Sequence, residues 1–100
     1  KNVVAYLTPD FILDYVSDVY QIDRKLIVSK NRSSNVADAR NLCVSLIRKH
    51  TDLSLSQIGL FLGGRSHSTI LSCLRRSKDS TLLLKEVNIF DNKINFVGVS

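Results

Sequence analysis

Two adjacent glycines, Gly63 and Gly64, separate two short segments that each carry the signals of a helix. Glycine readily adopts the positive φ angles that end a helix and reverse the chain, so this pair predicts a sharp turn. Ahead of the turn, Ser54 and Gln57 have the S-x-x-Q spacing of a capping box, which starts a helix at the next residue. The apolar residues that follow recur at helical spacing on one face: Ile58, Phe61 and Leu62.

After the turn, Ser66 is a good N-cap for a second helix, and this helix is amphipathic. Its buried side is predicted to consist of Ile70, Leu71 and Leu74. Its outward side is predicted to consist of Ser68, Thr69, Ser72, Arg75 and Arg76. A short helix, a glycine turn and a second helix with a polar outer face together predict a helix-turn-helix over about residues 54–77.

The same stretch resembles a known family. The run GGRSHSTIL, from residue 63, resembles the GGRDHTTVL signature of the C-terminal DNA-binding domain (domain IV) of the bacterial replication initiator DnaA. Residues 26–32, LIVSKNR, are similar to its L-x-S-K-x-R segment, and Val36, Ala37 and Arg40 match its V-A-x-x-R. Thr51 with SLSQIG matches its T-x-x-S-L-x-x-I-G, so the similarity covers about residues 10–77.

This resemblance implies a Trp-repressor-like arrangement of helices and binding to double-stranded DNA. Independently of it, the helix signals predict an all-α domain of five or six helices around one core. One hundred residues are enough for a single domain, residues 1–100, but not for an added nucleotide-binding module. The chain starts at Lys1 and contains no methionine, and we expect it to be a fragment of a larger protein.

Positive charge is concentrated in the middle of the sequence. The net charge is +5, but residues 24–78 hold eleven Lys and Arg against two Asp, a net of +9. Residues 1–23 carry −3 and residues 79–100 carry −1. A basic surface releases counterions when it neutralises phosphates, so the pattern suits a nucleic-acid partner. The charge alone is equally consistent with a plain solvated surface, and its combination with the helix-turn-helix favours nucleic acid.

Three further helices are predicted around the basic segment. Thr8 as N-cap with Pro9 in the first turn starts a helix whose buried stripe is predicted to be Phe11, Ile12, Tyr15, Val16 and Val19. Asp23 caps a short turn through Ile27. Asn35 and Asp38 are predicted to cap a longer helix over about residues 36–50, with Asn41, Ser45 and Arg48 opposite its inner face.

The ends of the chain carry weaker signals. Residues 1–7 are predicted to be an irregular or short extended lead. Residues 81–90 are predicted to form a last helix, and INFVGV near the end is predicted to be a loose or strand-like tail.

The loop of residues 29–35 is polar and basic, which is typical of a surface connector. It is also suited to laying Arg32 in a narrow, A·T-rich minor groove, whose negative potential attracts arginine. The resemblance favours the second interpretation, because Arg32 matches the family's minor-groove arginine, and it places Lys30 beside it on the DNA.

The resemblance assigns most of the remaining contacts to two helices. It implies that Arg40 and Asn41 hold the DNA backbone, that Arg48 approaches the major groove, and that Arg65 contacts DNA at the turn. At the start of the second helix it implies base contacts by Ser66, His67 and Ser68, with Thr69 in a supporting or phosphate contact. By helical phase alone His67 is in line with Ile70 and Leu74, so the residues also allow it to cover the core edge.

Five positions depart from the family pattern. Ser34 stands where the family often carries another basic residue, and Ala39 replaces a typical proline. Ser66 replaces an aspartate that accepts from cytosine, so sequence preference is expected to be relaxed or shifted at one base pair, at about 1–3 kcal/mol per good contact. Asn41 replaces a longer glutamine. Asp38 adds a negative charge near the expected phosphates, which lowers the expected affinity.

Other chemistries find little support. Cys43 and Cys73 fall on apolar helix faces and are predicted to be buried thiols. With His50 and His67 they lack the spacing of a zinc site, and GGR lacks the phosphate-loop pattern, so we expect no metal, no cofactor, no small-molecule substrate and no enzymatic activity. We find no signal peptide and no apolar run long enough for a membrane helix, and we expect a cytoplasmic, nucleoid-associated protein.

The predicted function is sequence-specific binding at DnaA-box-like sites, of the TTATNCACA type, in the initiation of chromosome replication. No heptad seam is visible, so binding as a monomer is expected. Two alternatives stay open: a DnaA-like domain on a phage, transposition-associated or transcription-regulating protein, and a protein-interaction module that has lost DNA binding.

Overall fold

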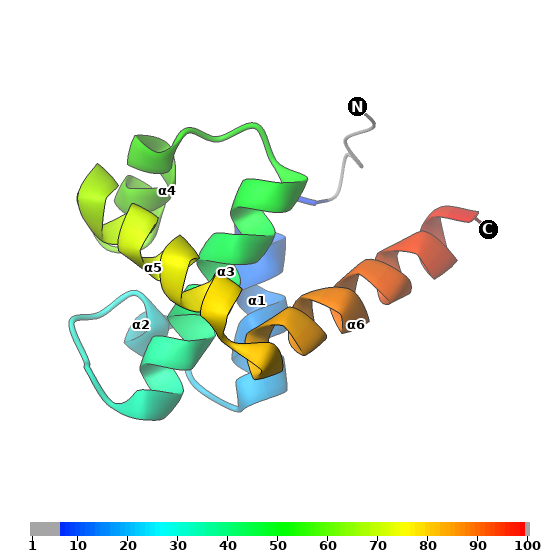
Figure 1. Ribbon diagram of the computed structural model, residues 1–100, viewed down its shortest axis with the longest axis horizontal. Helices are drawn as coiled ribbons and strands as arrows, with labels where there is room; N and C mark the ends of the chain where they lie inside the picture. Colours follow the sequence, from blue (N-terminus) through cyan, green and yellow to red (C-terminus); the bar gives the residue numbers. More distant parts are fainter. Residues whose placement is uncertain (1–6, 100) are drawn as a thin grey trace.

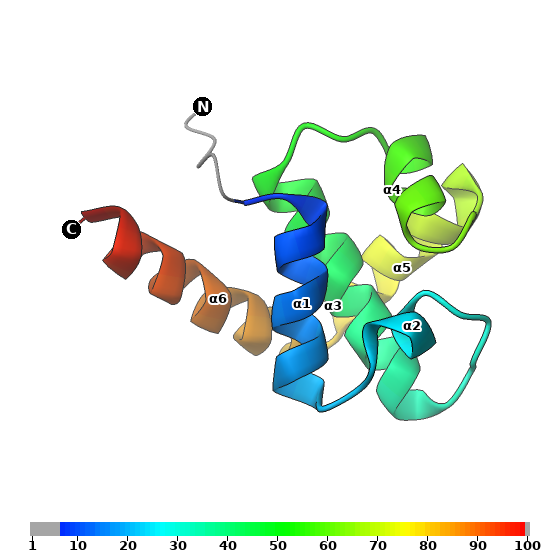
Figure 2. The ribbon, with the colours of Figure 1, turned by 180° about the vertical axis from the view of Figure 1, so that it is seen from behind.

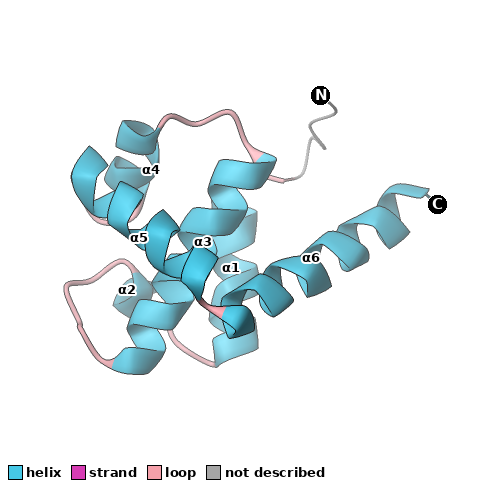
Figure 3. Cartoon of the chain, in the orientation of Figure 1, coloured by secondary structure: helices cyan, strands magenta, loops and turns pink. Residues whose placement is uncertain are grey.

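A computed structural model describes the backbone of residues 7–99 and the side chains of residues 7–94. These residues form six α-helices and no strand (Figure 3). The helices are α1 (Pro9–Tyr20), α2 (Arg24–Ile27), α3 (Ser34–His50), α4 (Leu55–Phe61), α5 (His67–Asp79) and α6 (Thr81–Val99). The predicted all-α class and the number of helices are therefore confirmed. Of the predicted N-terminal lead, only Leu7 is among the described residues, and it is buried.

Helix α3 is the centre of the domain. It packs against all five other helices, and the middle of the helix is buried on nearly every side (Figure 1). Asn41, predicted to face away from the core, is only 7% exposed, so that prediction is wrong. A helix enclosed by five neighbours has no free face at its middle, and only near its end does Arg48 reach the surface.

Helix α3 also begins earlier than predicted. Its N-cap is Ser33 rather than Asn35, so the helix gains two residues at its start. The Ser33 side chain does not cap the helix, because its hydroxyl donates instead to Asn31 Oδ1 at 2.6 Å. The loop before α3 is correspondingly shorter and is held by its own hydrogen bonds.

The predicted start of α1 is confirmed, since the Thr8 hydroxyl accepts a hydrogen bond from the Phe11 amide at 3.1 Å. Its buried stripe is partly wrong. The buried residues are Ile12, Leu13 and Val16, whereas Phe11 and Val19 are 41% and 39% exposed. Because α1 packs against both α2 and α3, its buried arc is turned towards Leu13.

Helix α6 continues well past Phe90, so the predicted loose tail is wrong. Phe90 is buried, with its ring 4.7 Å from that of Tyr15 and 5.3 Å from that of His50. The next residue, Asp91, bonds to His50 Nε2 at 2.7 Å and pairs with Lys49. These contacts anchor the middle of the helix and favour its continuation, and its far end projects away from the other helices (Figures 1 and 2).

Candidate nucleic-acid interface

Helices α4 and α5 form the predicted helix-turn-helix. Ser54 and Gln57 make both bonds of the capping box, at 3.1 Å and 2.8 Å, and fix the start of α4. Gly63 and Gly64 have φ angles of +89° and +81°, which confirms the glycine turn. Ser66 caps α5 by accepting the Thr69 amide at 3.2 Å.

Two glycines, Gly59 and Gly63, allow the backbone of the turn to pack closely against neighbouring backbone. A Cβ atom on Gly59 would lie 2.0 Å from the backbone oxygen of Arg65, and one on Gly63 would lie 2.1 Å from that of Val28. Gly64 has open space around it. Gly59 therefore lets the turn pack on α4, and Gly63 lets it pack on the segment that follows α2.

The first turn of α5 presents a row of polar side chains to solvent. Ser66, His67, Ser68 and Thr69 are all exposed, so His67 does not cover the core edge. The Ser66 and Thr69 hydroxyls lie 3.0 Å apart and share a hydrogen bond. The side chains of His67 and Ser68 have no hydrogen-bond partner in the described part of the chain, which leaves both side chains free for a ligand. The arrangement matches that of a recognition helix, whose N-terminal residues meet base edges.

The loop of residues 28–33 lies beside the helix-turn-helix, at the end of the molecule away from the tip of α6 (Figures 1 and 2). It is shaped from within by hydrogen bonds from the Asn31 amide to Ser29 Oγ, at 3.1 Å, and from the Ser33 amide to Asn31 Oδ1, at 2.8 Å. Lys30 and Arg32 project from it, exposed. Serine and asparagine are frequent turn formers, so the sequence carried a signal for this shaping, although the shaping was not among our predictions.

Arg40 and Arg65, both predicted to contact DNA, bond to the backbone of this loop. Arg40 is 8% exposed and donates to the carbonyl oxygens of residues 27, 29 and 31 at 2.8, 2.9 and 3.1 Å. Arg65 donates to those of residues 28 and 29 at 3.3 and 2.5 Å, and to that of residue 62 in its own turn. Burial lowers the pKa of both guanidinium groups, and Arg65 lowers that of Arg40 further. No motif in the sequence indicated these bonds.

Other basic residues differ in what they contact. Arg24 pairs with Asp10, at 2.7 Å, and with Asp14, and these hydrogen bonds raise its pKa. Lys49 is paired with Asp91. Among the described residues no acidic partner is found for Lys30, Arg32, Arg48, Arg75, Arg76 or Lys78. Lys25 on α2 and Lys85 on α6 likewise have none, so most of this positive charge, but not all of it, lies on the loop, the end of α3 and α5.

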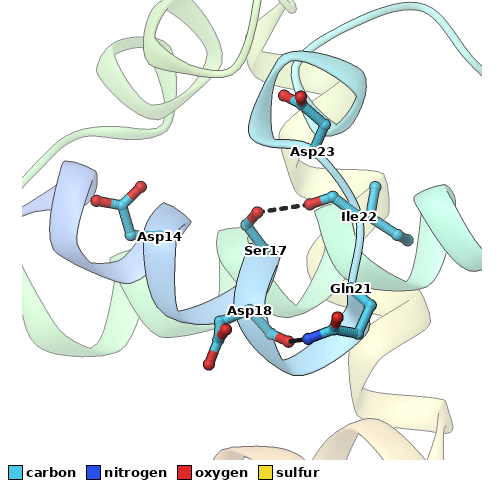
Figure 4. Close-up of a pocket in the computed structure, with 6 residues that line it drawn as sticks. All are labelled: Asp14, Ser17, Asp18, Gln21, Ile22 and Asp23. Atoms are coloured by element: carbon cyan, nitrogen blue, oxygen red, sulfur yellow. Dashed lines mark hydrogen bonds between the residues drawn. The ribbon is translucent and has the colours of Figure 1, made fainter.

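The acidic residues gather elsewhere. Asp14, Asp18 and Asp23 line a shallow hollow between the C-terminal half of α1 and the start of α2 (Figure 4). There Ser17 Oγ donates to the Ile22 carbonyl at 2.5 Å and Gln21 Nε2 to that of Asp18 at 2.7 Å. Carboxylates repel phosphate, so this hollow is unsuited to nucleic acid.

Asp38 was expected to weaken phosphate binding. Burial raises the pKa of Tyr20, on α1, and the charge of Asp38 raises it further. Asp38 itself is half-buried near the start of α3, and its effect on phosphate binding stays a prediction.

Two absences among the described residues bear on other functions. Within residues 7–99 no helix is long and apolar enough to cross a membrane. Nowhere in the same part of the chain do three His, Cys, Asp or Glu side chains come together as a metal site requires. Cys43 and Cys73 are unpaired and buried, as predicted.

Comparison with known proteins agrees with this geometry. Residues 9–76 match the family model described as the bacterial dnaA protein helix-turn-helix. The chain is 37% identical over 81 residues to the chromosomal replication initiator protein DnaA of Gloeobacter violaceus, and 33% identical over 95 residues to that of Flavobacterium psychrophilum. These alignments cover 81% and 95% of the chain but only 18% and 20% of the relatives. With DnaA of Herpetosiphon aurantiacus, identity is 43% over 65 residues, 65% of the chain and 14% of the relative.

Proposed function

Because this chain belongs to the bacterial DnaA helix-turn-helix family, we propose that it binds double-stranded DNA at DnaA-box-like sites and thereby contributes to the initiation of chromosome replication. The matched part is the helix-turn-helix rather than a catalytic domain. The chain spans about a fifth or less of the length of the relatives. The role of a whole protein, its place at the nucleoid and its binding as a monomer are therefore parts of this proposal.

One observation carries the proposal: two exposed sets of residues lie together at one end of the molecule. The first turn of α5 offers Ser66, His67, Ser68 and Thr69, and the adjoining loop offers Lys30 and Arg32. A helix N-terminus of this kind fits the major groove, and a loop arginine fits the adjacent minor groove.

The unpaired charges suit this placement. Arg48 at the end of α3 and the basic residues of α5 are available for phosphates that flank the two grooves. We assign base reading to His67, Ser68, Ser66 and Arg32, and backbone contacts to Lys30, Arg48 and Thr69.

The test is fluorescence anisotropy with a duplex carrying a TTATNCACA box and with a scrambled duplex, each titrated at several salt concentrations. We expect a preference of at least about tenfold for the box, equivalent to ~1.4 kcal/mol. The slope of log affinity against log salt counts phosphate contacts at about 0.9 per contact.

Single substitutions separate charge from base reading. His67→Ala should remove most of the preference while leaving the salt slope nearly unchanged, because it carries no phosphate contact in this proposal. Lys30→Ala should weaken binding to both duplexes equally and lower the slope by about 0.9. Arg32→Ala should lose affinity for the box, whereas Arg24→Ala should not, because Asp10 and Asp14 already hold the Arg24 charge.

Two outcomes would contradict the proposal. Equal and steeply salt-dependent binding to both duplexes would indicate a nonspecific DNA-binding domain. Absence of binding even at low salt would favour the interaction-module alternative.

A further inference from the structure

We propose that Arg40 and Arg65 are positioning residues rather than DNA contacts, and that they clamp the loop of residues 28–33 against the helix-turn-helix. The clamp holds Lys30 and Arg32 in a set position relative to the first turn of α5. This inference rests on the proposed DNA-binding function and specifies how its two reading elements are joined.

The first half of the clamp is Arg40. Its Nε and Nη2 atoms make three hydrogen bonds, to the carbonyls of residues 27, 29 and 31. These are every second carbonyl along the chain from the end of α2 into the loop. A planar guanidinium suits this task, because its donors are held in a rigid fork.

The second half is Arg65, which comes from the opposite side. It bonds to the carbonyl of residue 62 within the helix-turn-helix and to those of residues 28 and 29 across the junction. The carbonyl of Ser29 thus accepts from both arginines, at 2.9 Å from Arg40 and 2.5 Å from Arg65. One loop oxygen is held from α3 and from the turn at once.

The backbone carbonyls of residues 27–31 explain why two arginine side chains lie beside this loop. Ile27 ends the short helix α2 and Val28 is its C-cap, and the last carbonyls of a helix lack partners within it. Cationic side chains near a helix C-terminus satisfy such carbonyls. In the described residues no carboxylate is bonded to either arginine, so backbone oxygens are their partners.

The same bonds argue against a direct role on DNA. Arg40 is only 8% exposed, and turning its guanidinium towards a phosphate would leave the carbonyls of residues 27 and 31 without the donor that they have in this structure. Arg48, two turns further along α3, is exposed and needs no such rearrangement. Helix α3 thus carries two arginines that can be compared directly: Arg40, which holds the loop, and Arg48, which is available to DNA.

Conservative substitution gives the first test. A lysine retains the charge for a phosphate but cannot bond to three carbonyls in the geometry of a guanidinium. We expect Arg40→Lys and Arg65→Lys to weaken binding to the box about as much as Arg40→Gln does. A direct phosphate contact predicts instead that both lysine variants bind like wild type.

A double-mutant cycle gives the second test. Once Lys30 and Arg32 are both replaced by alanine, the position of the loop no longer matters for binding. Arg40→Gln should therefore cost about tenfold in affinity in the wild-type background but less than about twofold in the double-alanine background. The control is Arg48→Gln, which should reduce affinity by the same factor in the wild-type and the double-alanine backgrounds. An equal loss in both backgrounds for Arg40→Gln, with a salt slope lower by about 0.9, would overturn the proposal.

Hydrogen exchange in the DNA-free protein completes the experiment. The amides of Asn31 and Ser33 are bonded within the loop and should exchange faster in Arg40→Lys, while core amides of α3 and the thermal midpoint report that the domain is still folded. Unchanged exchange at these two amides would contradict the clamp. If wild type shows no preference for the box, the proposed function fails, and the exchange result still decides whether the clamp exists.

Discussion

Individual residues at the tip of α5 differ in how much of their hydrogen-bonding capacity is used within the protein. Ser66 caps the helix and shares a hydrogen bond with Thr69, so part of its bonding capacity is used internally. His67 and Ser68 have no such duty among the described residues. Substitution at positions 67 and 68 should therefore change DNA preference with little effect on stability, whereas position 66 affects both.

Position 66 allows a gain-of-specificity prediction. Ser66→Asp retains a good N-cap and adds a charged acceptor for a cytosine amine, so the ratio of box to scrambled affinity should rise by up to ~1–3 kcal/mol. Affinity for the scrambled duplex should fall, because the added charge repels phosphate. Anisotropy with both duplexes measures the ratio, and the thermal midpoint, expected to be unchanged, serves as control. A ratio that stays constant would contradict a base contact at this position.

Replacing Gly59 by alanine should have two opposing effects on stability, a gain from helix propensity and a larger loss from packing. Alanine is a better helix former by about 1 kcal/mol, yet its Cβ would overlap the Arg65 oxygen at 2.0 Å. Gly59→Ala should therefore lower the free energy of unfolding, by about 1–3 kcal/mol, as overpacking does. Urea denaturation measures the change. Ser56→Ala, on the exposed side of α4, is the control and should be neutral or slightly stabilising.

At the scale of elements, local signals predicted the helix starts best. Capping at Thr8, Asp23, Ser54 and Ser66 is confirmed, because a cap involves only residues close in sequence. Which faces are buried was predicted less well. The enclosure of α3 depends on five other helices, and the length of α6 depends on contacts made by Phe90 and Asp91 with distant helices.

In the candidate site, too, the features set by local sequence were predicted and those set by tertiary contacts were not. The exposed tip of α5 was predicted, since the turn and the cap define it locally. The bonds of Arg40 and Arg65 to the loop were not, because they join residues 9 to 37 positions apart and depend on the tertiary arrangement of α2, α3 and the turn. A sequence shows that an arginine is present but not which oxygens it meets.

Helix α6 offers a prediction at this scale. Phe90→Ala removes a buried ring between Tyr15 and His50 and should cost about 3–5 kcal/mol of unfolding free energy. The neighbouring Ile89, 39% exposed, is the matched control, and Ile89→Ala should cost far less. Urea denaturation measures both. At a temperature where Phe90→Ala is still folded, its affinity for DNA should match wild type, and a specific loss of box preference would contradict a purely structural role for α6.

For the whole molecule, the two buried thiols predict how stability depends on pH. Burial raises the pKa of Cys43 and Cys73, so the folded state retains thiol protons that the unfolded chain releases near its ordinary pKa of about 8.5. The unfolding free energy should therefore be constant below about pH 8 and fall above it, by up to ~1.4 kcal/mol per pH unit for each thiol.

Urea denaturation between about pH 7.5 and pH 9.5 measures this slope, below the range where tyrosines and lysines dominate. Cys43→Ala, whatever its effect on absolute stability, should show a shallower slope than wild type. An identical slope in the two proteins would mean that this thiol does not contribute.

The contact between Gly63 and the Val28 carbonyl, together with the two arginines, has a consequence for the DNA as well as for the protein. If the loop and α5 form one rigid body, the distance between the segment read in the minor groove and that read in the major groove is constant. Inserting a single base pair between those segments moves them apart by ~3.4 Å and rotates one about the axis by ~35°. A rigid body cannot follow that change. Under the proposed function, the domain should therefore discriminate between duplexes by the spacing of the two segments as well as by their bases.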